Sequence, residues 1–225
     1  AAAAATQLSP VDLSCRELRA LPLPLLGVRV LELSLAFNCL VSVDELPAAC
    51  PNLTRLSVAH NEIRALPKNL PASLVRVDAS YNELSSLNGL AGCTALEDLL
   101  LAHNNLAIGA LVSIRPLTKL KLLVLMSNPC AKASPSGLSR ALATLLFPSL
   151  VSFDARTVDA ASRAETHVLM KQQHARQALA AEIGHKSAIE VLRVLPRLVA
   201  TASPVTKASG VTEVGGGDLG GGGDG

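Results

Sequence analysis

The sequence repeats one apolar frame around an asparagine, and this periodicity restricts the chain to very few folds. The repeated asparagines are Asn38, Asn61, Asn82, Asn104 and Asn128, which stand 23, 21, 22 and 24 residues apart. Around the third of them the apolar frame consists of Leu74, Val77, Ala79, Leu84 and Leu87. A fixed period in this range indicates a solenoid in which each repeat forms one turn.

Each repeat divides into a half that packs and a half that faces solvent. Before Asn61, Leu56 and Val58 alternate with Arg55 and Ser57, as in a short strand with one buried face. One turn cannot bury its leucines alone, so stacked turns are expected to build a parallel sheet over one core. Because an amide both donates and accepts, we predict a ladder of buried asparagines in which terminal Asn128 stabilises less than central Asn82.

These positions resemble the leucine-rich repeat, Leu-x-x-Leu-x-Leu-x-x-Asn-x-Leu, with Arg16 replacing the asparagine of an atypical first turn. The run from Pro148 to Asp154 resembles the carboxy-terminal cap of the short class, with repeats of roughly 22 residues. Two positions differ from that cap, Ser139 in place of tyrosine and Ala155 in place of glycine. The resemblance implies an α/β fold, a curved right-handed coil with a concave parallel sheet and a convex side of 3₁₀ segments and turns.

Composition and pattern divide the chain into four segments. They are a low-complexity leader at 1–7, a repeat domain at 8–158 with its cap at about 128–158, a helical extension at 159–200 and a disordered glycine-rich tail at 201–225. The five alanines at the start leave open that the chain is a fragment.

Three helices are predicted after the last repeat. Ser134 and Pro135 predict the start of a cap helix that runs to about Phe147. Capping-box spacing at Ser162 predicts a helix that continues to Gly184, and Ser187 repeats the signal for a shorter helix. We expect this extension either to pack on the cap or to bind a partner.

Composition argues against several classes of function. Tryptophan is absent, aromatic residues make up 2% of the chain and the net charge is +2. Stacking platforms and a basic stripe for nucleic acid are therefore expected to be missing. The five cysteines show no Cys-x-x-Cys spacing, which favours free thiols in the cytoplasm, with cytoskeletal or ciliary locations as alternatives. Apolar runs shorter than about 18 residues predict no membrane span.

Candidate catalytic and metal-binding groups do not converge in sequence. His60 and His103 are two strands apart with Tyr81 between them, and His167 and His174 are two helical turns apart. Ser57 is about 10 Å along its strand from His60. We therefore expect no catalytic, cofactor-binding or metal site and no enzymatic activity.

The outward strand positions supply the candidate binding residues. These are Arg55, Arg76, Asp78, Tyr81, Asp98, Leu100, Leu122, Val124 and Met126. The first part of this concave face is polar, whereas its last two repeats are apolar, and a contiguous apolar surface usually marks a contact site. The alternative is that the extension covers this apolar part as an intramolecular lid.

The class that the chain resembles includes type-1 phosphatase regulatory subunits, an axonemal dynein light chain and the spliceosomal A-prime protein. The resemblance implies a non-catalytic binding surface. Our first hypothesis is an adaptor or scaffold that holds an apolar, helical element of another protein against the concave face. A regulatory subunit of an enzyme such as a type-1 phosphatase is the alternative, and a ribonucleoprotein component is a weaker one. The sequence leaves the partner's identity and the oligomeric state open.

Overall fold

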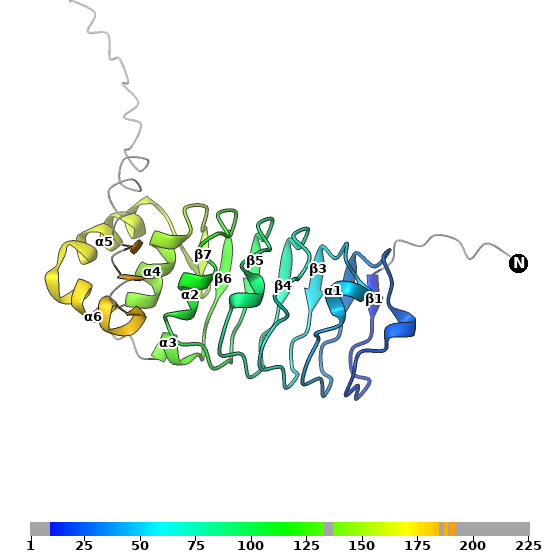
Figure 1. Ribbon diagram of the computed structural model, residues 1–225. Coiled ribbons are helices and arrows are strands. Elements are labelled where there is room, and N and C mark those ends of the chain that lie inside the picture. The colour runs from blue at the N-terminus through cyan, green and yellow to red at the C-terminus, as the bar shows by residue number, and fades with distance from the viewer. Residues whose placement is uncertain (1–9, 133–136, 185–186, 189, 192–225) are drawn as a thin grey trace, which may run out of the picture.

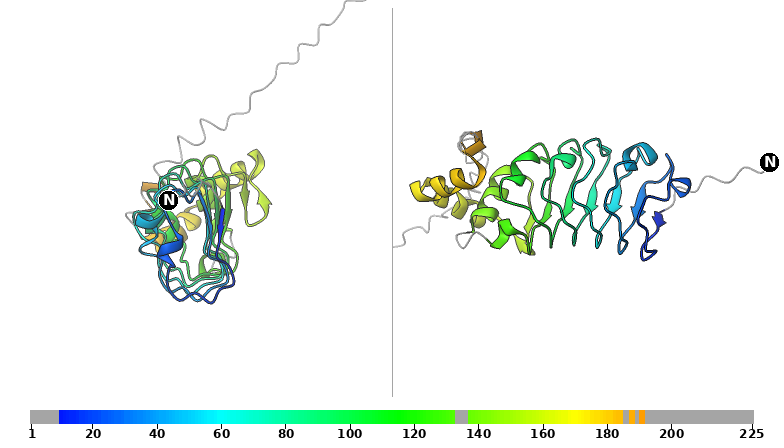
Figure 2. Two further views of the ribbon diagram at one scale, coloured as in Figure 1. Left: turned by 90° about the vertical axis from the view of Figure 1, so that its right-hand side faces the viewer. Right: turned by 60° about the horizontal axis from the view of Figure 1, so that its bottom comes forward.

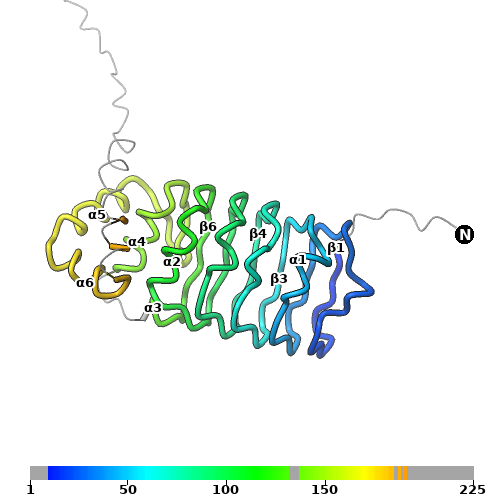
Figure 3. The backbone as a smooth tube through the Cα atoms, in the orientation of Figure 1, coloured from blue at the N-terminus to red at the C-terminus, as the bar shows by residue number. Residues whose placement is uncertain are grey.

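The computed structural model describes residues 10–132, 137–184, 187–188 and 190–191. The leader predicted at 1–7 and the tail predicted at 201–225 lie outside these residues. The described chain winds into an elongated coil whose successive turns stack side by side, as the backbone tube in Figure 3 shows. One short strand from each turn contributes to a single sheet along the length of the coil (Figure 1).

The sheet contains eight strands in sequence order. They are β1 (Pro10–Asp12), β2 (Glu32–Ser34), β3 (Arg55–Ser57), β4 (Arg76–Asp78), β5 (Asp98–Leu100), β6 (Leu122–Val124), β7 (Ser152–Phe153) and β8 (Arg156–Thr157). Neighbouring strands from β1 to β7 pair in parallel, and only β8 is antiparallel to its neighbour. The register aligns equivalent repeat positions, so that Arg55 pairs with Arg76 and Ser57 with Asp78.

The buried core follows from the alternation within each strand. The middle residues of β2 to β6 are buried, and they are Leu33, Leu56, Val77, Leu99 and Leu123. Their flanking residues are partly or fully exposed on the opposite face. Cys50 and Cys93 are also fully buried among aliphatic side chains. The core is continuous because each turn covers the leucines of the next.

The return segments carry short helical pieces between the strands. These are the 3₁₀ segments η1 (Leu23–Leu25) and η2 (Asn88–Leu90) and the α-helical turns α1 (Leu46–Ala49) and α2 (Ala110–Ser113). The return between β3 and β4 contains no helix within its described residues. The side opposite the sheet therefore combines 3₁₀ segments, single α turns and irregular turns.

The asparagines connect neighbouring turns through their side-chain amides. The Nδ2 atom of Asn82 donates to the carbonyl of Val58 in the preceding repeat at 2.9 Å, and its Oδ1 accepts the N–H of Ile63 at 3.0 Å. Equivalent contacts recur at Asn38, Asn61, Asn104 and Asn128. The first turn has Arg16 at this position, and its N–H is instead accepted by Asn38 at 3.0 Å.

The cap consists of α3 (Pro129–Lys132) and α4 (Leu138–Leu146) followed by the β7–β8 hairpin. The predicted start of the cap helix at Pro135 is wrong, because Gly137 adopts a left-handed φ of 68° and the helix begins after it. Ser134 and Pro135 themselves lie outside the described residues. Phe147 and Leu150 are buried and continue the core under this cap.

The extension begins with α5 (Ala160–Lys171) and α6 (Gln173–Ile183). The prediction of one helix starting at Ser162 is wrong in two respects. Asp159 is the N-cap, since its carboxylate accepts the N–H of Ser162, and Gln172 adopts an extended ψ of 132° that separates the two helices. The helix does end at Gly184. Residues 187–188 and 190–191 are helical, and the rest of the second predicted helix lies outside the described residues.

Candidate functional site

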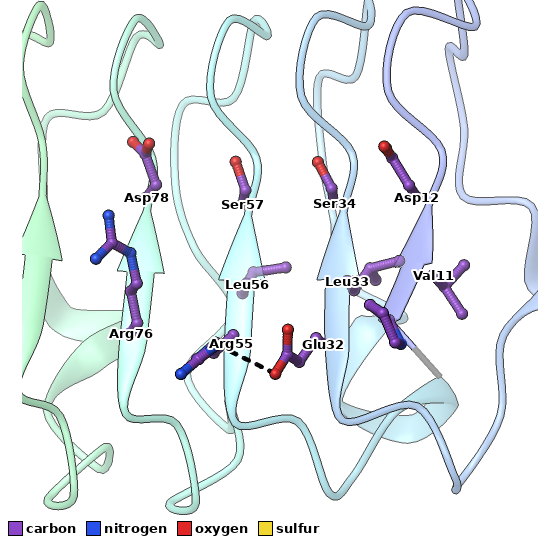
Figure 4. Close-up of a pocket in the computed structure, with 11 residues that line it drawn as sticks. Val11, Asp12, Glu32, Leu33, Ser34, Arg55, Leu56, Ser57, Arg76 and Asp78 are labelled. Carbon is purple, nitrogen blue, oxygen red and sulfur yellow. Dashed lines mark hydrogen bonds and ion pairs between the residues drawn. The ribbon is translucent and has the colours of Figure 1, made fainter. Parts of the chain in front are cut away.

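The outward side chains of β1 to β6 form what we call the sheet face. Figure 4 shows two of its rows on β1 to β4, one with Glu32, Arg55 and Arg76 and one with Asp12, Ser34, Ser57 and Asp78. Arg55 pairs with Glu32 at 3.2 Å and Arg76 pairs with Asp98 at 3.1 Å, both across neighbouring strands. The charged row is therefore electrically balanced, with two cations flanked by two anions.

A shallow groove of about 390 Å³ follows these rows over the first four strands. Its lining includes both arginines and the hydroxyl and carboxylate groups of the second row. Among the described residues, Asp12 and Asp78 form no ion pair; each accepts a backbone N–H two residues later, from Ser14 and Ser80 respectively, at 3.0 Å. The hydrogen bonds from Ser14 lower the pKa of Asp12 below its usual value. These carboxylates are available to a cationic partner.

The four residues that precede the first four asparagines form a stacked column of rings, which we call the ring column. Phe37, His60, Tyr81 and His103 stack with centroid separations of 4.1, 4.0 and 4.1 Å and interplanar angles of 11° to 12°. Phe37 is 55% exposed and Tyr81 is 44% exposed. The solenoid thus gathers two of its few aromatic side chains with two histidines in one column.

The backbone explains why these rings align. All four ring residues have φ between 54° and 56°, a left-handed conformation that costs a residue with a Cβ about 1–2 kcal/mol. The same conformation in every turn sends each ring in the same direction, and the strand spacing of about 4.8 Å brings neighbours close to stacking distance. Ring faces are occupied by neighbouring rings, so a partner meets ring edges along most of the column.

The sheet face becomes apolar at β5 and β6. Leu100, Leu122 and Val124 are partly buried there, and Met126 after β6 is 51% exposed. Helix α5 packs on α4 and α6 packs on α5, at the end of the solenoid beside the last turns, as two further views show in Figure 2. The side opposite the sheet, which carries the return segments and is called the return side, also contacts the extension. The contact is an ion pair of 3.3 Å between Arg115 and Glu190. The described helices therefore lie at the end and on the return side rather than as a lid over this apolar part.

The structure thus brings the sequence candidates into one continuous surface. Arg55, Arg76 and Asp78 line the groove, Asp98 holds Arg76, and Tyr81 belongs to the ring column. Sequence reasoning missed Phe37, His60 and His103 as parts of this surface, whereas Asp12 and Glu32 were recognisable as outward strand positions but were not among the candidates. The recurrence of a ring immediately before four successive asparagines is the signal that could have found the column.

The titratable residues of the described chain do not assemble a metal centre. No group of three His, Cys, Asp or Glu side chains in the described ranges is placed to hold a metal ion. Tyr81 separates the rings of His60 and His103, and Gln172 places His167 and His174 on two different helices rather than one. Burial raises the pKa of the Cys93 and Cys130 thiols to about 11, which makes them poor nucleophiles.

The helices of the described ranges were not built to span a membrane: every one of them is too short or too polar to cross a bilayer.

Comparison with known proteins gives partial matches. No family model matches the chain. It is 41% identical over 83 residues to podocan-like protein 1 of Mus musculus, covering 35% of this chain and 15% of that protein. It is 39% identical over 105 residues to the geranylgeranyl transferase type-2 alpha subunit of Bos taurus, covering 44% of this chain and 18% of that protein. The chain therefore spans less than a fifth of the length of either relative.

Solved structures match over a larger part of the chain. A leucine-rich repeat protein of Leptospira interrogans superposes with a TM-score of 0.52 at 23% identity, over 65% of this chain and 42% of that one. The Drosophila melanogaster SNF/U2A' complex matches with a TM-score of 0.49 at 20% identity, over 76% of this chain and 86% of that one. Together with the asparagine ladder and the parallel sheet, the match to the Leptospira protein identifies the fold as a leucine-rich repeat solenoid, and helices α5 and α6 form its helical extension.

Proposed function

We propose that this protein is a non-catalytic adaptor that holds a segment of another protein against its sheet face. The observation that carries the proposal is the continuity of that face, in which the polar groove over β1 to β4 leads into the apolar residues Leu100, Leu122 and Val124. Such a gradient supplies apolar anchors beside polar groups that fix orientation. A cytoplasmic location belongs to the same proposal, because all five cysteines are free thiols.

The test compares two substitutions of the same chemistry on different surfaces. Val124→Asp introduces a charge at an outward position of β6, whereas Val41→Asp introduces the same charge at a 52% exposed position outside the strands. Proteins captured by affinity purification with the unmutated chain are identified by mass spectrometry and then titrated against both variants. We expect Val124→Asp to weaken binding about thirtyfold, since a partner would have to bury an uncompensated charge, and Val41→Asp to bind normally.

Circular dichroism on both variants separates binding from folding. The core residue Leu123 behind Val124 is untouched, so both variants are expected to keep the spectrum of the unmutated chain. A folded Val124→Asp variant that binds the captured partner as tightly as Val41→Asp does would place the binding surface elsewhere. That result would contradict the proposed function.

A further inference from the structure

We infer, on the basis of the proposed function, that the sheet face takes an α-helix lying across the strands, with two basic residues about three helical turns apart against Asp12 and Asp78. This inference names the chemistry of the partner segment. It rests on the spacing of the strands, on the shape of the surface between the charged row and the ring column, and on the charges that remain unpaired there.

The spacing of the strands matches a helix better than an extended chain. Neighbouring strands lie about 4.8 Å apart. A helix repeats one face every 5.4 Å, whereas side chains on one face of an extended chain recur every 6.6–6.8 Å. A helix tilted by about 27° to the row of strands has a projected pitch of about 4.8 Å and moves about 2.5 Å along the strands with each turn, or about 7 Å over three turns. Each repeat can then meet one turn of the helix, and the long side chains of lysine or arginine bridge the displacement at the two ends.

The shape of the sheet face provides a seat for such a helix. Its floor consists of small side chains at equivalent positions in successive turns, namely Ser34, Ala36, Ser57, Ala59 and Ser80. The charged row lies on one side of this floor and the ring column lies on the other. Glu32 and Phe37 mark the two sides within one turn and are five residues apart along the chain, which limits their separation to at most about 16 Å, since Phe37 with its left-handed φ is not extended. A helix of about 10 Å diameter fits within this limit.

The charges determine which helix fits. Arg55 and Arg76 are each neutralised by an acidic neighbour, so they contribute little net charge to the seat. Asp12 and Asp78 keep their carboxylates without an ion pair among the described residues, although Arg16 lies close enough to influence the pKa of Asp12. The seat is therefore acidic at both ends of the groove. Lysine or arginine side chains of a partner complement it.

The register of the strands converts these positions into a sequence pattern. Asp12 on β1 and Asp78 on β4 are three strand spacings apart, about 14 Å, which corresponds to three turns of a tilted helix, or eleven residues. Leu100 and Val124 lie one and two strands further on. The partner stripe is thus basic, small, small, basic, apolar and apolar, with one position for each turn of the helix.

The test uses synthetic peptides as probes. A fluorescein-labelled helical peptide carries lysines eleven residues apart, serines on the two intervening turns and leucines on the two following turns, on an alanine and glutamine background. A second peptide has glutamate in place of both lysines, and a third has a central proline that prevents the helix. Each peptide is also made in the reverse order, because either direction of the helix satisfies the pattern. Fluorescence anisotropy measures binding at low and high salt.

We expect the lysine peptide to bind at least tenfold more tightly than the glutamate and proline peptides at low salt, in one of the two directions. Combining Asp12→Asn with Asp78→Asn should remove most of the preference for lysine, and asparagine keeps an acceptor for the N–H groups of Ser14 and Ser80, so the turns are retained. Asp44→Asn combined with Glu45→Gln is the matched control, since it removes the same two negative charges at exposed positions outside the groove lining.

Three results would overturn the inference. They are equal binding of the lysine and glutamate peptides, equal binding of the proline peptide, and failure of every peptide to bind the unmutated chain. None of them affects the comparison of Val124→Asp with Val41→Asp on a captured natural partner. The proposed function and the inferred chemistry of the partner therefore fail separately.

Discussion

The Oδ1 atom of Asp154 accepts the backbone N–H of Leu125 at 2.6 Å and so closes the last full turn of the solenoid from the cap. The same oxygen accepts the N–H of Met126 at 3.0 Å. In earlier turns the N–H equivalent to that of Leu125 donates to a backbone carbonyl of the next strand, as Leu101 does to Val124 at 2.9 Å. After the last full turn the cap carboxylate takes over that role. Burial nevertheless raises the pKa of Asp154, so ionisation of this carboxylate opposes folding.

We predict that Asp154→Asn raises the melting temperature at pH 7, because asparagine keeps the acceptor and carries no charge to desolvate. Since the folded-state pKa is raised, the unfolded chain loses this proton first and stability falls as pH rises through the unfolded and then the folded pKa. The advantage of asparagine should therefore disappear below about pH 3.5, under the unperturbed aspartate pKa of about 3.9. Thermal scans across pH measure this difference.

The control for this prediction is Asp154→Ala, which removes the acceptor altogether. Leaving the N–H groups of Leu125 and Met126 unpaired should cost about 1–3 kcal/mol for each that stays buried. An asparagine variant as unstable as the alanine variant at pH 7 would show that the negative charge itself is required.

We predict that Ala155→Gly stabilises the protein by about 0.5–1 kcal/mol. Ala155 has a φ of 61°, and the left-handed strain that glycine relieves exceeds the extra entropy that glycine loses on folding. Ala91→Gly is the control, because Ala91 has an ordinary helical φ of −58° and its replacement should destabilise the chain. Urea unfolding gives both free energies, and a loss of stability in both variants would argue against strain at Ala155.

We predict that Asn82→Ala lowers the free energy of unfolding by about 1–3 kcal/mol, because the carbonyl of Val58 and the N–H of Ile63 lose their partner inside the protein.

The expectation that Asn128→Ala matters less is revised by the structure. Asn128 is fully buried beneath the cap and donates to the carbonyl of Leu101 at 2.7 Å. Denaturant titrations should show that Asn128→Ala lowers the free energy of unfolding at least as much as Asn82→Ala does. Unchanged unfolding midpoints in both variants would contradict a stabilising role of the asparagine ladder.

We predict that Gly89→Ala destabilises the fold by about 1–3 kcal/mol through overpacking. A Cβ at this position would lie 2.8 Å from the carbonyl oxygen of Pro67, which is backbone of the neighbouring return segment and cannot rotate away. A Cβ at Gly92, in contrast, meets no atom within 4 Å. Gly92→Ala should therefore be neutral or slightly stabilising in the same thermal scan. Equal stability of the two variants would mean that the return segments are not tightly stacked.

The sequence alone determined the features that depend on local periodicity. The spacing of the asparagines and the alternation around residues such as Leu56 indicated the solenoid, its core and its outward rows. The same alternation identified Arg55, Arg76 and Leu122 as outward residues, and the strands present them in that way. These features follow from the two-residue period of a strand and from the period of the repeat, and both periods can be read directly from the amino-acid sequence.

Only the tertiary structure decided how side chains from different turns meet. Phe37 and His60 are distant in sequence, and they stack because the strand register and a left-handed φ in both turns align their rings. The pairing of Arg55 with Glu32 likewise depends on which strands are neighbours, and the carboxylate of Glu32 neutralises the charge of Arg55. The break at Gln172 is another such feature, since the sequence around it is compatible with one helix, yet Gln172 adopts an extended backbone conformation. Contacts of this kind depend on packing between segments, which local propensity does not encode.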